Sequence, residues 1–316
     1  MREKKPVLIV IGGPTASGKT GVAAALAKHL GTEVISADSR QFYHAMRIGT
    51  ARPPEEELLG VTHYFLGHLG LQETWSAGEF ARQAEPVLQD ILARHGQAVM
   101  VGGSGLYIDA LCNGLDPIPP TDHHERARLQ EQFRESGLQP LLDRLHELDP
   151  ESWRTIDRNN PHRVIRALEV CLSSGRPFSA QRTGPRQRED VRIVRIALDL
   201  PRTDLYARID ARVDRMVADG LVEEARSLLP CRELNALNTV GYKELFAHFD
   251  NPSPTLPGGE GAELARITAL IKQHTRNYAK RQMTWLRRDP SWKHFAPEDQ
   301  AGMLAVIDGA KGALQT

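Results

Sequence analysis

The fold is decided by residues 7–31, which read VLIVIGGPTASGKTGVAAALAKHLG. The first five of these residues are a short, largely β-branched run followed by two glycines, which is typical of a strand buried on both faces of a parallel sheet. Residues 18–30 then have helical spacing, because Val22, Leu26 and Leu30 share one side and Gly31 supplies a stop. A strand, a glycine-rich turn and a helix in this order predict the start of an α/β domain.

The turn between that strand and that helix carries a phosphate-binding motif. It fits the pattern G-x-x-x-x-G-K-[ST], and the flanking strand and helix are the context that this pattern requires. The backbone amides of such a loop point into a concavity, and the N-terminus of the helix adds positive potential. Lys19 has the length to reach terminal phosphate oxygens, and the Thr20 hydroxyl can ligate Mg²⁺. The predicted phosphate cradle consists of Gly13, Pro14, Thr15, Ala16, Ser17, Gly18, Lys19 and Thr20.

Strands and helices continue to alternate through residue 111. Glu33–Ala37 and Ala98–Val101 are further candidates for buried strands. Between them, Ser76 and Glu79 have the spacing of a capping box, which predicts a helix that ends near Gly96. This alternation predicts a parallel sheet flanked by helices.

A proline-rich stretch at residues 116–120, DPIPP, marks a change in the chain. The residues after it are polar and helical in pattern, and strand character returns only at residues 191–200. We therefore predict an α/β fold of the P-loop NTPase-like class, with a catalytic core at residues 1–120 and 191–316 and a helical insertion at residues 121–190.

The last part of the core is predicted to be helical. An apolar stripe predicts a helix or helix pair at residues 203–229, and a final helix covers residues 262–287. Residues 251–261, which are rich in proline and glycine, are predicted to form a loop between them.

Composition limits the class of protein. The 316 residues include 40 basic and 40 acidic side chains, so a uniformly basic nucleic-acid binder is excluded. Three scattered cysteines without a C-x-x-C pair argue against a disulfide framework or a structural zinc site and favour the cytoplasm. No apolar run approaches the ~20 residues of a membrane helix, and the run at residues 7–11 is too short for a signal peptide.

Two polar residues follow predicted strands and are therefore expected at the ligand-binding edge of the sheet. Asp38 is a candidate general base or orienting carboxylate, and the alternative is an aspartate that only caps a turn. Ser104, in the sequence GGSG at residues 102–105, offers a hydroxyl to a ligand, and the alternative is a helix cap. That strand ends without the carboxylate that usually holds Mg²⁺ in P-loop NTPases, which disfavours nucleotide hydrolysis.

Three arginines of the helix at residues 203–229 have the spacing of one helix face. Arg208, Arg212 and Arg215 could present guanidinium groups to a phosphate. The alternative is a solvated face on which they pair with aspartates of the same helix, namely Asp204, Asp210 and Asp214.

Positive charge is concentrated in two regions. Residues 158–195 hold nine arginines against three carboxylates, and residues 266–293 hold eight cations against one. In the second region Lys272, Arg276 and Lys280 form a stripe. Tyr278 and Trp285 are interleaved with it and have rings that could stack on bases. Cations with interleaved rings are typical of a single-stranded RNA site, whereas the alternative is a helix with core aromatics and solvated cations.

Taken together, these residues resemble the tRNA dimethylallyltransferase family, also called tRNA isopentenyltransferases. The resemblance runs from about residue 7 to residue 287, and its ordered set of motifs is highly specific. The motifs are GPTASGKT at 13–20, DSRQ at 38–41, IGTARP at 48–53, VGGSGLY at 101–107, HRVIRALEV at 162–170, VGYKE at 240–244 and AKRQMTWLR at 279–287.

The resemblance implies transfer of a dimethylallyl group from dimethylallyl diphosphate to the exocyclic 6-amino group of the adenosine 3′ of the anticodon. It also implies Mg²⁺ as cofactor, the anticodon stem-loop of tRNA as partner, and a monomer. Residues 13–20 would bind the diphosphate, with Thr20 at the metal, and Asp38, Ser104 and Arg212 would be catalytic. The family usually has Thr where Ser104 stands, so the hydroxyl is kept and the methyl is lost.

The residues that the resemblance assigns to tRNA binding come from both parts of the chain. They are Asp38, Ser39, Arg40, Gln41, Ser104, Arg126, His162, Arg163, Val164, Ile165, Arg166, Asn238, Thr239, Val240, Gly241, Tyr242, Lys243, Lys280, Arg281, Gln282, Thr284, Trp285 and Arg287.

Two other functions compete with this prediction. A P-loop small-molecule kinase would use ATP and would need no basic RNA-binding regions. A non-catalytic RNA-binding protein would keep its P-loop only as a structural element, so that RNA binding would be unaffected by Asp38→Ala.

Overall fold

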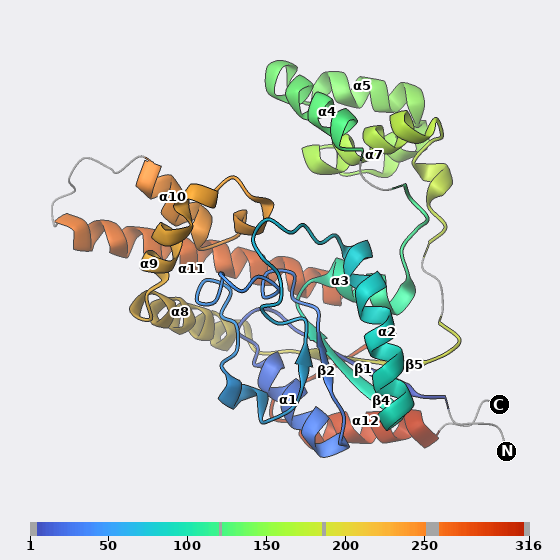
Figure 1. Ribbon diagram of the computed structural model, residues 1–316, viewed down its shortest axis with the longest axis vertical. Coiled ribbons are helices and arrows are strands. Elements are labelled where there is room, and N and C mark those ends of the chain that lie inside the picture. The colour runs from blue at the N-terminus through green and yellow to red at the C-terminus, as the bar shows by residue number, and fades with distance from the viewer. Residues whose placement is uncertain (1–4, 120–121, 185–187, 251–258, 313–316) are drawn as a thin grey trace. The chain divides into compact units, whose positions relative to one another are not determined.

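The computed structural model describes residues 5–119, 122–184, 188–250 and 259–312, with the backbone alone at residue 260. Its centre is a sheet of six parallel strands in the order β3-β2-β4-β1-β5-β6 (Figure 1). The predicted α/β class is confirmed. The strands are β1 (Val7–Gly12), β2 (Val34–Ser36), β3 (His63–Tyr64), β4 (Gln97–Gly102), β5 (Arg192–Leu198) and β6 (Trp292–Phe295).

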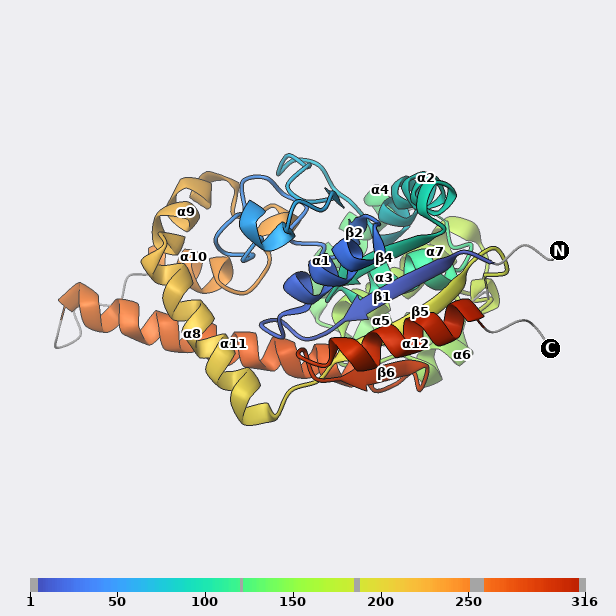
Figure 2. The ribbon, with the colours of Figure 1, turned by 90° about the horizontal axis from the view of Figure 1, so that it is seen from below.

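Helices cover both faces of this sheet, as the apolar run in β1 predicts. Leu8 and Val10 pack into a core with α2 (Ala77–His95) and α3 (Gly105–Asn113). The alternate residues of β1 pack into a second core with α1 (Lys19–Leu30) and α12 (Gln300–Gly312), seen together in Figure 2. Each fully buried aliphatic side chain contributes about 1.5–3 kcal/mol, so β1 is a firm base for the loop that follows it.

Helix α2 begins where the sequence predicts, but only half of its capping box forms. The Ser76 hydroxyl accepts a hydrogen bond from the Glu79 amide at 3.1 Å. The Glu79 carboxylate does not return to Ser76 and instead accepts hydrogen bonds from Arg82 and Gln83. Gly96 ends the helix in the left-handed conformation at φ +68°.

The C-terminal part of the core is a group of helices next to the sheet (Figure 1). The predicted pair consists of α8 (Arg202–Ala218) and α9 (Leu221–Leu228), followed by α10 (Tyr242–Asp250) and the 28-residue α11 (Gly259–Leu286). Of the predicted loop at 251–261, residues 251–258 lie outside the described residues. Short 3₁₀ helices are found at Glu55–Leu58, Ser179–Gln181, Leu229–Cys231 and Asn235–Leu237.

The prediction that the helix at 262–287 ends the fold is wrong, because β6 and α12 follow it. Strand β6 has four residues, of which Lys293 and His294 are exposed, so it lacks the apolar pattern of a buried strand. Helix α12 contains Gly302 and Gly309. Because glycine lowers helix propensity, the sequence of this segment does not predict a helix. Strand β3 was missed because it has only two residues.

The chain divides into two compact units, residues 1–112 with 188–316 and residues 113–187. The second unit is helical, with α4 (His123–Ser136), α5 (Gln139–Leu148), α6 (Pro150–Thr155) and α7 (Pro161–Ser174). Two of these helices begin with proline behind a capping side chain, since Asp149 accepts from the Ser152 amide and Asn160 from the Arg163 amide. Its core includes Leu129, Leu141, Leu145, Val164 and Leu168.

Contacts within the first unit join the two points at which the chain leaves it for the helical unit and returns to it. Arg188 donates to the Glu85 carboxylate at 2.7 and 2.6 Å and to the Leu111 carbonyl at 3.2 Å. It also pairs with Asp190. The residues before and after the helical unit are therefore tied together within the first unit itself.

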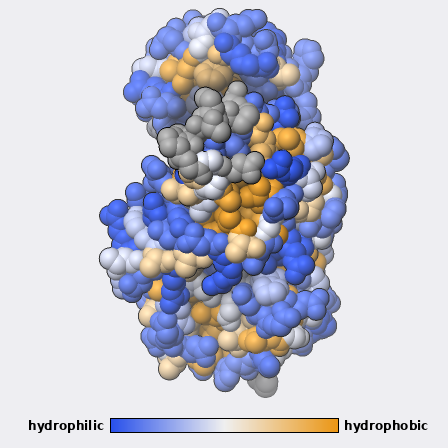
Figure 3. Space-filling model, turned by 90° about the vertical axis from the view of Figure 1, so that its left-hand side faces the viewer, coloured by the Kyte–Doolittle hydropathy of each residue, from blue (hydrophilic) through white to orange (hydrophobic). Residues whose placement is uncertain are grey.

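The surface is mostly polar. Figure 3 shows one face of the molecule, on which hydrophilic residues predominate and hydrophobic residues form patches between them. Large hydrophobic side chains that are exposed among the described residues are Leu59, Leu106, Leu115, Leu148 and Leu264. In the part of the chain that the structure describes, no helix is both long and apolar enough to cross a membrane.

Candidate active site

The loop after β1 has the geometry of an anion-binding cradle. Ala16 and Gly18 both have positive φ, +66° and +87°, and the Ser17 amide donates to the Pro14 carbonyl at 3.2 Å. Alternation of this kind turns successive amides toward one concavity. The Ser17 hydroxyl is fully buried and has no hydrogen-bond partner among the described residues. The loop therefore has the shape of a phosphate cradle.

Lys19 lies at the mouth of this cradle. Its ammonium group is 3.5 Å from the Pro14 carbonyl, to which it donates. Desolvation lowers the pKa of Lys19 to about 8, Asp38 opposes this shift, and the positive charge of Arg212 adds to it. A cation in such surroundings is stabilised by an anionic ligand.

Arg212 reaches the cradle from α8. Its guanidinium donates to the Thr15 hydroxyl at 3.1 Å, and burial lowers its pKa although Glu57 and Asp38 are near. The Arg208 guanidinium lies 3.6 Å from Glu298, and one of its nitrogens would be 3.9 Å from a Cβ on Gly18 of the phosphate loop. Of this predicted face, Arg212 thus donates a hydrogen bond to the phosphate loop and Arg208 lies beside the loop.

The aspartates of α8 have other partners than the sequence suggested. Asp210 pairs with Arg276 and Asp214 with Lys272, both on α11. We call these two ion pairs the α8–α11 seam. The alternative in which the aspartates neutralise arginines of their own helix is therefore wrong for Asp210 and Asp214, and two of the three cations of the predicted RNA-binding stripe hold two helices together.

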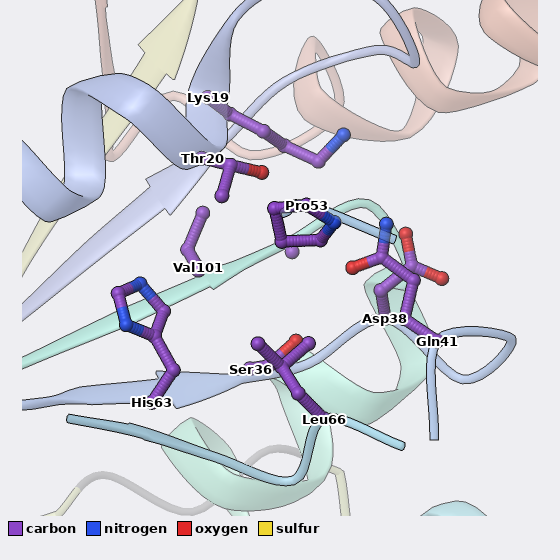
Figure 4. Close-up of a pocket in the computed structure, with 10 residues that line it drawn as sticks. Lys19, Thr20, Ser36, Asp38, Gln41, Pro53, His63, Leu66 and Val101 are labelled. Carbon is purple, nitrogen blue, oxygen red and sulfur yellow. The ribbon is translucent and has the colours of Figure 1, made fainter. Parts of the chain in front are cut away.

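Asp38 follows β2 and faces the same loop. It lines a pocket that Figure 4 shows, together with Lys19 and Thr20. One of its carboxylate oxygens also accepts a hydrogen bond from the Arg40 amide at 3.2 Å, so the turn-capping role weighed from the sequence is present as well. The full lining is Lys19, Thr20, Ser36, Asp38, Gln41, Pro53, His63, Leu66, Val101 and Gly102.

Ser104 is joined to the loop that carries Asp38. Its hydroxyl accepts a hydrogen bond from the Ser39 amide at 3.1 Å and lies 3.1 Å from the Ser39 hydroxyl. The preceding strand end comes so close to β2 that a Cβ on Gly102 would lie 2.4 Å from the Ala37 carbonyl oxygen. Close backbone approach thus explains the glycine and brings the Ser104 hydroxyl next to residues 38–39.

Gln282 has a position that the sequence did not reveal. It is 7% exposed, accepts a hydrogen bond from the Thr15 amide at 2.8 Å and donates to the Gly103 carbonyl at 2.9 Å. Trp285, one turn later, donates to Asp109 at 3.3 Å and packs edge-on against Trp292. The C-terminal turns of α11 therefore bridge the phosphate loop and the loop after β4.

Two further side chains brace the loop at residues 38–52. The Arg40 guanidinium donates to the carbonyls of residues 235, 236 and 238 at 2.8, 2.9 and 3.3 Å. The Glu224 carboxylate accepts from the amides of residues 47, 48 and 49 and from the Tyr242 hydroxyl, all within 3.0 Å. Sequence analysis missed Glu224, because a single glutamate in an amphipathic helix carries no distinguishing signal.

The residues predicted to contact tRNA divide by exposure. Val164, Ile165, Gly241, Tyr242 and Gln282 are buried. The tRNA prediction is kept for the accessible members, which are Asp38, Ser39, Arg40, Gln41, Ser104, Arg126, His162, Arg163, Arg166, Asn238, Thr239, Val240, Lys243, Lys280, Arg281, Thr284, Trp285 and Arg287.

In the helical unit a buried carboxylate holds two of these arginines. Glu169 is fully buried and forms ion pairs with Arg166 and, at 3.8 Å, with Arg126. Arg166 also donates to the Pro119 carbonyl at 2.7 Å. Both guanidinium groups are therefore fixed in place within this unit.

The pocket offers oxygen ligands rather than a metal cluster of its own. No group of three His, Cys, Asp or Glu side chains in the described ranges is placed to hold a metal ion. Mg²⁺ commonly binds through one or two protein oxygens, several waters and substrate phosphates. The Thr20 hydroxyl beside a phosphate loop fits that manner of binding.

Fold and site together define the class of protein, a P-loop α/β protein in which a carboxylate shares a pocket with the lysine and threonine of the phosphate-loop motif. A family model described as IPP transferase matches residues 41–289. The chain belongs to this family, as its motifs predicted.

Curated relatives and solved structures agree. The chain is 46% identical to the tRNA dimethylallyltransferase of Christiangramia forsetii over 91% of this chain and 92% of the relative. It is 42% identical to tRNA dimethylallyltransferase 1 of Bacteroides thetaiotaomicron, with 96% and 95% of the two chains covered. The predicted enzyme class, a transferase, is thereby confirmed.

Two solved structures have the same fold. The tRNA isopentenylpyrophosphate transferase of Bacillus halodurans has a TM-score of 0.68 at 34% identity, over 98% of this chain and 97% of that one. A eukaryotic dimethylallyltransferase acting on tRNA has a TM-score of 0.73 at 23% identity, over 96% and 77%, and supports the fold alone.

Proposed function

We propose that this protein transfers the dimethylallyl group of dimethylallyl diphosphate to the exocyclic 6-amino group of the adenosine 3′ of the anticodon in tRNA. One observation carries the proposal: the Lys19 and Arg212 cations at the phosphate loop face Asp38, while β4 ends without the carboxylate of a nucleotide hydrolase. The names of the relatives support tRNA as the acceptor and a dimethylallyl group as the group transferred.

The reaction exchanges one bond for another. The bond between the allylic carbon and the diphosphate oxygen breaks, and a bond between that carbon and the adenine nitrogen forms. The loop amides, Lys19 and Arg212 stabilise the charge on the departing diphosphate. Asp38 accepts the proton that the amine loses, and Ser104, held by Ser39, orients the base.

A magnesium ion would be held by Thr20 together with diphosphate oxygens and water. When bound, it would supply positive charge that stabilises the leaving group. We propose it as the cofactor because Thr20 lines the pocket beside the phosphate loop.

The tRNA would be bound by accessible cations of both units. Arg126 and Arg163 belong to the helical unit, and Lys243, Lys280 and Arg287 to the α/β unit. Cations of this kind hold backbone phosphates, and the target adenine must leave its stack to reach the pocket. We further propose that the helical insertion contributes to tRNA binding and that the protein acts as a monomer in the cytoplasm.

One incubation tests this function. Purified protein, Mg²⁺, dimethylallyl diphosphate labelled in the allyl group and unmodified tRNA should give labelled tRNA, with the label at the adenosine 3′ of the anticodon. A parallel incubation with γ-labelled ATP and no tRNA tests the kinase alternative. Unlabelled tRNA together with a phosphorylated small molecule would overturn the proposal.

A further inference from the structure

A histidine outside the predicted site lines the same pocket. His63 lies on β3, the edge strand that pairs with β2, and reaches the pocket that Thr20, Ser36 and Asp38 also line. Figure 4 shows His63 on one side of this pocket and Asp38 with Gln41 on the other. His63 is not part of any of the family motifs quoted from the sequence.

Its hydrogen bonding fixes which ring nitrogen carries the proton. Nδ1 lies 2.9 Å from the Val61 carbonyl oxygen, which can only accept a hydrogen bond. Nδ1 is therefore the donor, and Nε2 of the neutral ring is an acceptor. Burial lowers the pKa of His63, which keeps the ring neutral.

The acceptor nitrogen has no partner among the described residues. Nε2 is buried and receives no hydrogen bond from any of them. Buried polar atoms are nearly always satisfied by a partner, so an unsatisfied one that lines a pocket calls for a ligand that donates a hydrogen bond.

The phosphate loop beside this pocket limits which ligand can donate a hydrogen bond to Nε2. An ionised diphosphate has oxygen acceptors and no donor, and Mg²⁺ itself prefers oxygen to nitrogen ligands. Waters bound to Mg²⁺ are good donors, and this ion keeps several of them when it binds through a hydroxyl and phosphates.

We propose that His63 Nε2 accepts a hydrogen bond from a water molecule bound to the Mg²⁺ ion that Thr20 and the diphosphate would hold. This inference rests on the proposed function. His63 is thus a positioning residue of the metal site. A neutral acceptor there, in place of a carboxylate, makes Mg²⁺ binding depend on the diphosphate.

The test measures metal binding rather than turnover. Mg²⁺ is titrated calorimetrically into protein saturated with inorganic pyrophosphate, for the wild type, His63→Leu and His63→Gln. Leu removes the acceptor, whereas the Gln amide oxygen can replace it near the position of Nε2. We expect the Mg²⁺ Kd to rise about tenfold or more in His63→Leu and to stay within about threefold in His63→Gln, since one lost hydrogen bond to a charged assembly has about this effect.

His44 provides the matched control. Its Nδ1 contacts the Leu69 carbonyl oxygen at 2.7 Å, the same type of bond that His63 makes, and it does not line the pocket. His44→Leu should leave the Mg²⁺ Kd unchanged. Metal-free pyrophosphate affinity should be the same in all four proteins, which also reports that the variants are folded.

A second readout needs no variant. In ¹⁵N spectra of the wild type, the His63 Nε2 resonance should shift when Mg²⁺ is added to the pyrophosphate complex, and the His44 resonances should stay. Equal Mg²⁺ affinity in His63→Leu and wild type, or an unmoved Nε2 resonance, would overturn the inference. Transfer to tRNA that persists in that case would show that the proposed function stands without it.

Discussion

Two pairs of cations differ in whether a carboxylate pairs with them. The first pair is Lys19 of α1 with Arg212 of α8, and the second is Lys272 with Arg276, both of α11. Lys19 and Arg212 have no salt bridge to any described residue, and both have a lowered pKa. Lys272 and Arg276, in the α8–α11 seam, are each matched by an aspartate of α8. Helix α8 contributes to both, with Arg212 toward the phosphate loop and Asp210 and Asp214 toward α11. The pair without carboxylate partners is the one prepared for an anion, and the matched pair fastens helices.

Replacing the acid that faces the first pair should have the largest effect. Asp38→Ala should lower kcat by roughly 10²–10⁴, because the amine proton loses its acceptor. The same substitution at an aspartate of the α8–α11 seam, Asp214→Ala, should leave kcat within about twofold of the wild-type value.

The measurement is steady-state transfer to tRNA, with pyrophosphate affinity determined separately at pH 6.5. That pH matters because Asp38 raises the pKa of Lys19, so its removal promotes deprotonation of the lysine. At pH 6.5 the affinity should be nearly intact in Asp38→Ala, and its abolition would contradict the role given to Asp38.

Removing one cation from each pair compares them directly. Lys19→Met should reduce kcat/KM for dimethylallyl diphosphate by roughly 10²–10³, the loss typical of one group that stabilises a developing anion. Lys272→Met, an identical change in the seam, should reduce it by less than about threefold. Similar losses in both variants would show that the comparison is wrong.

The pH dependence of ligand binding separates the pairs more finely. An anion favours protonated Lys19, so its pKa, about 8 in the free protein, rises when pyrophosphate binds. The Kd of pyrophosphate should therefore be flat below that pH and rise by up to about tenfold per pH unit above it. In Lys19→Met the rise due to Lys19 should disappear. The pH dependence that remains comes from ionisation of pyrophosphate itself, and it is subtracted from the wild-type profile.

The smallest effect is expected for stability. Asp214→Asn should lower the free energy of unfolding by about 0.2–1 kcal/mol, because the Asp214 side chain is 58% exposed and solvent screens its pair with Lys272. Urea denaturation measures this, and the pair should weaken further in high salt. A loss of several kcal/mol would mean that the seam is a buried structural element instead.

The sequence predicts features that adjacent residues encode, and it does not predict contacts between residues that are far apart along the chain. The strand at residues 7–11, the phosphate loop and helix α1 adjoin one another, and their pattern is complete within 25 residues. Gln282 acts on the Thr15 amide from 267 positions away, and Glu224 on the Gly49 amide from 175. Such contacts arise only when distant elements pack, so no period or spacing announces them.

His63 shows a different limit. Its place on a two-residue edge strand has no apolar pattern, and the bond of Nδ1 to Val61 is a detail of backbone geometry. Charge counts failed for a similar reason at Lys272 and Arg276, since the number of cations in a region does not reveal which of them have partners.

The contacts of Arg188 have a consequence for the origin of the chain. Because this residue ties Glu85, Asp190 and the Leu111 carbonyl together, the α/β unit secures both stumps of residues 113–187 by itself. The helical unit is then an insertion into an α/β unit whose ends are held by its own contacts. Ancestral chains could therefore acquire, lengthen or exchange this insertion while the sheet and its phosphate loop were inherited unchanged.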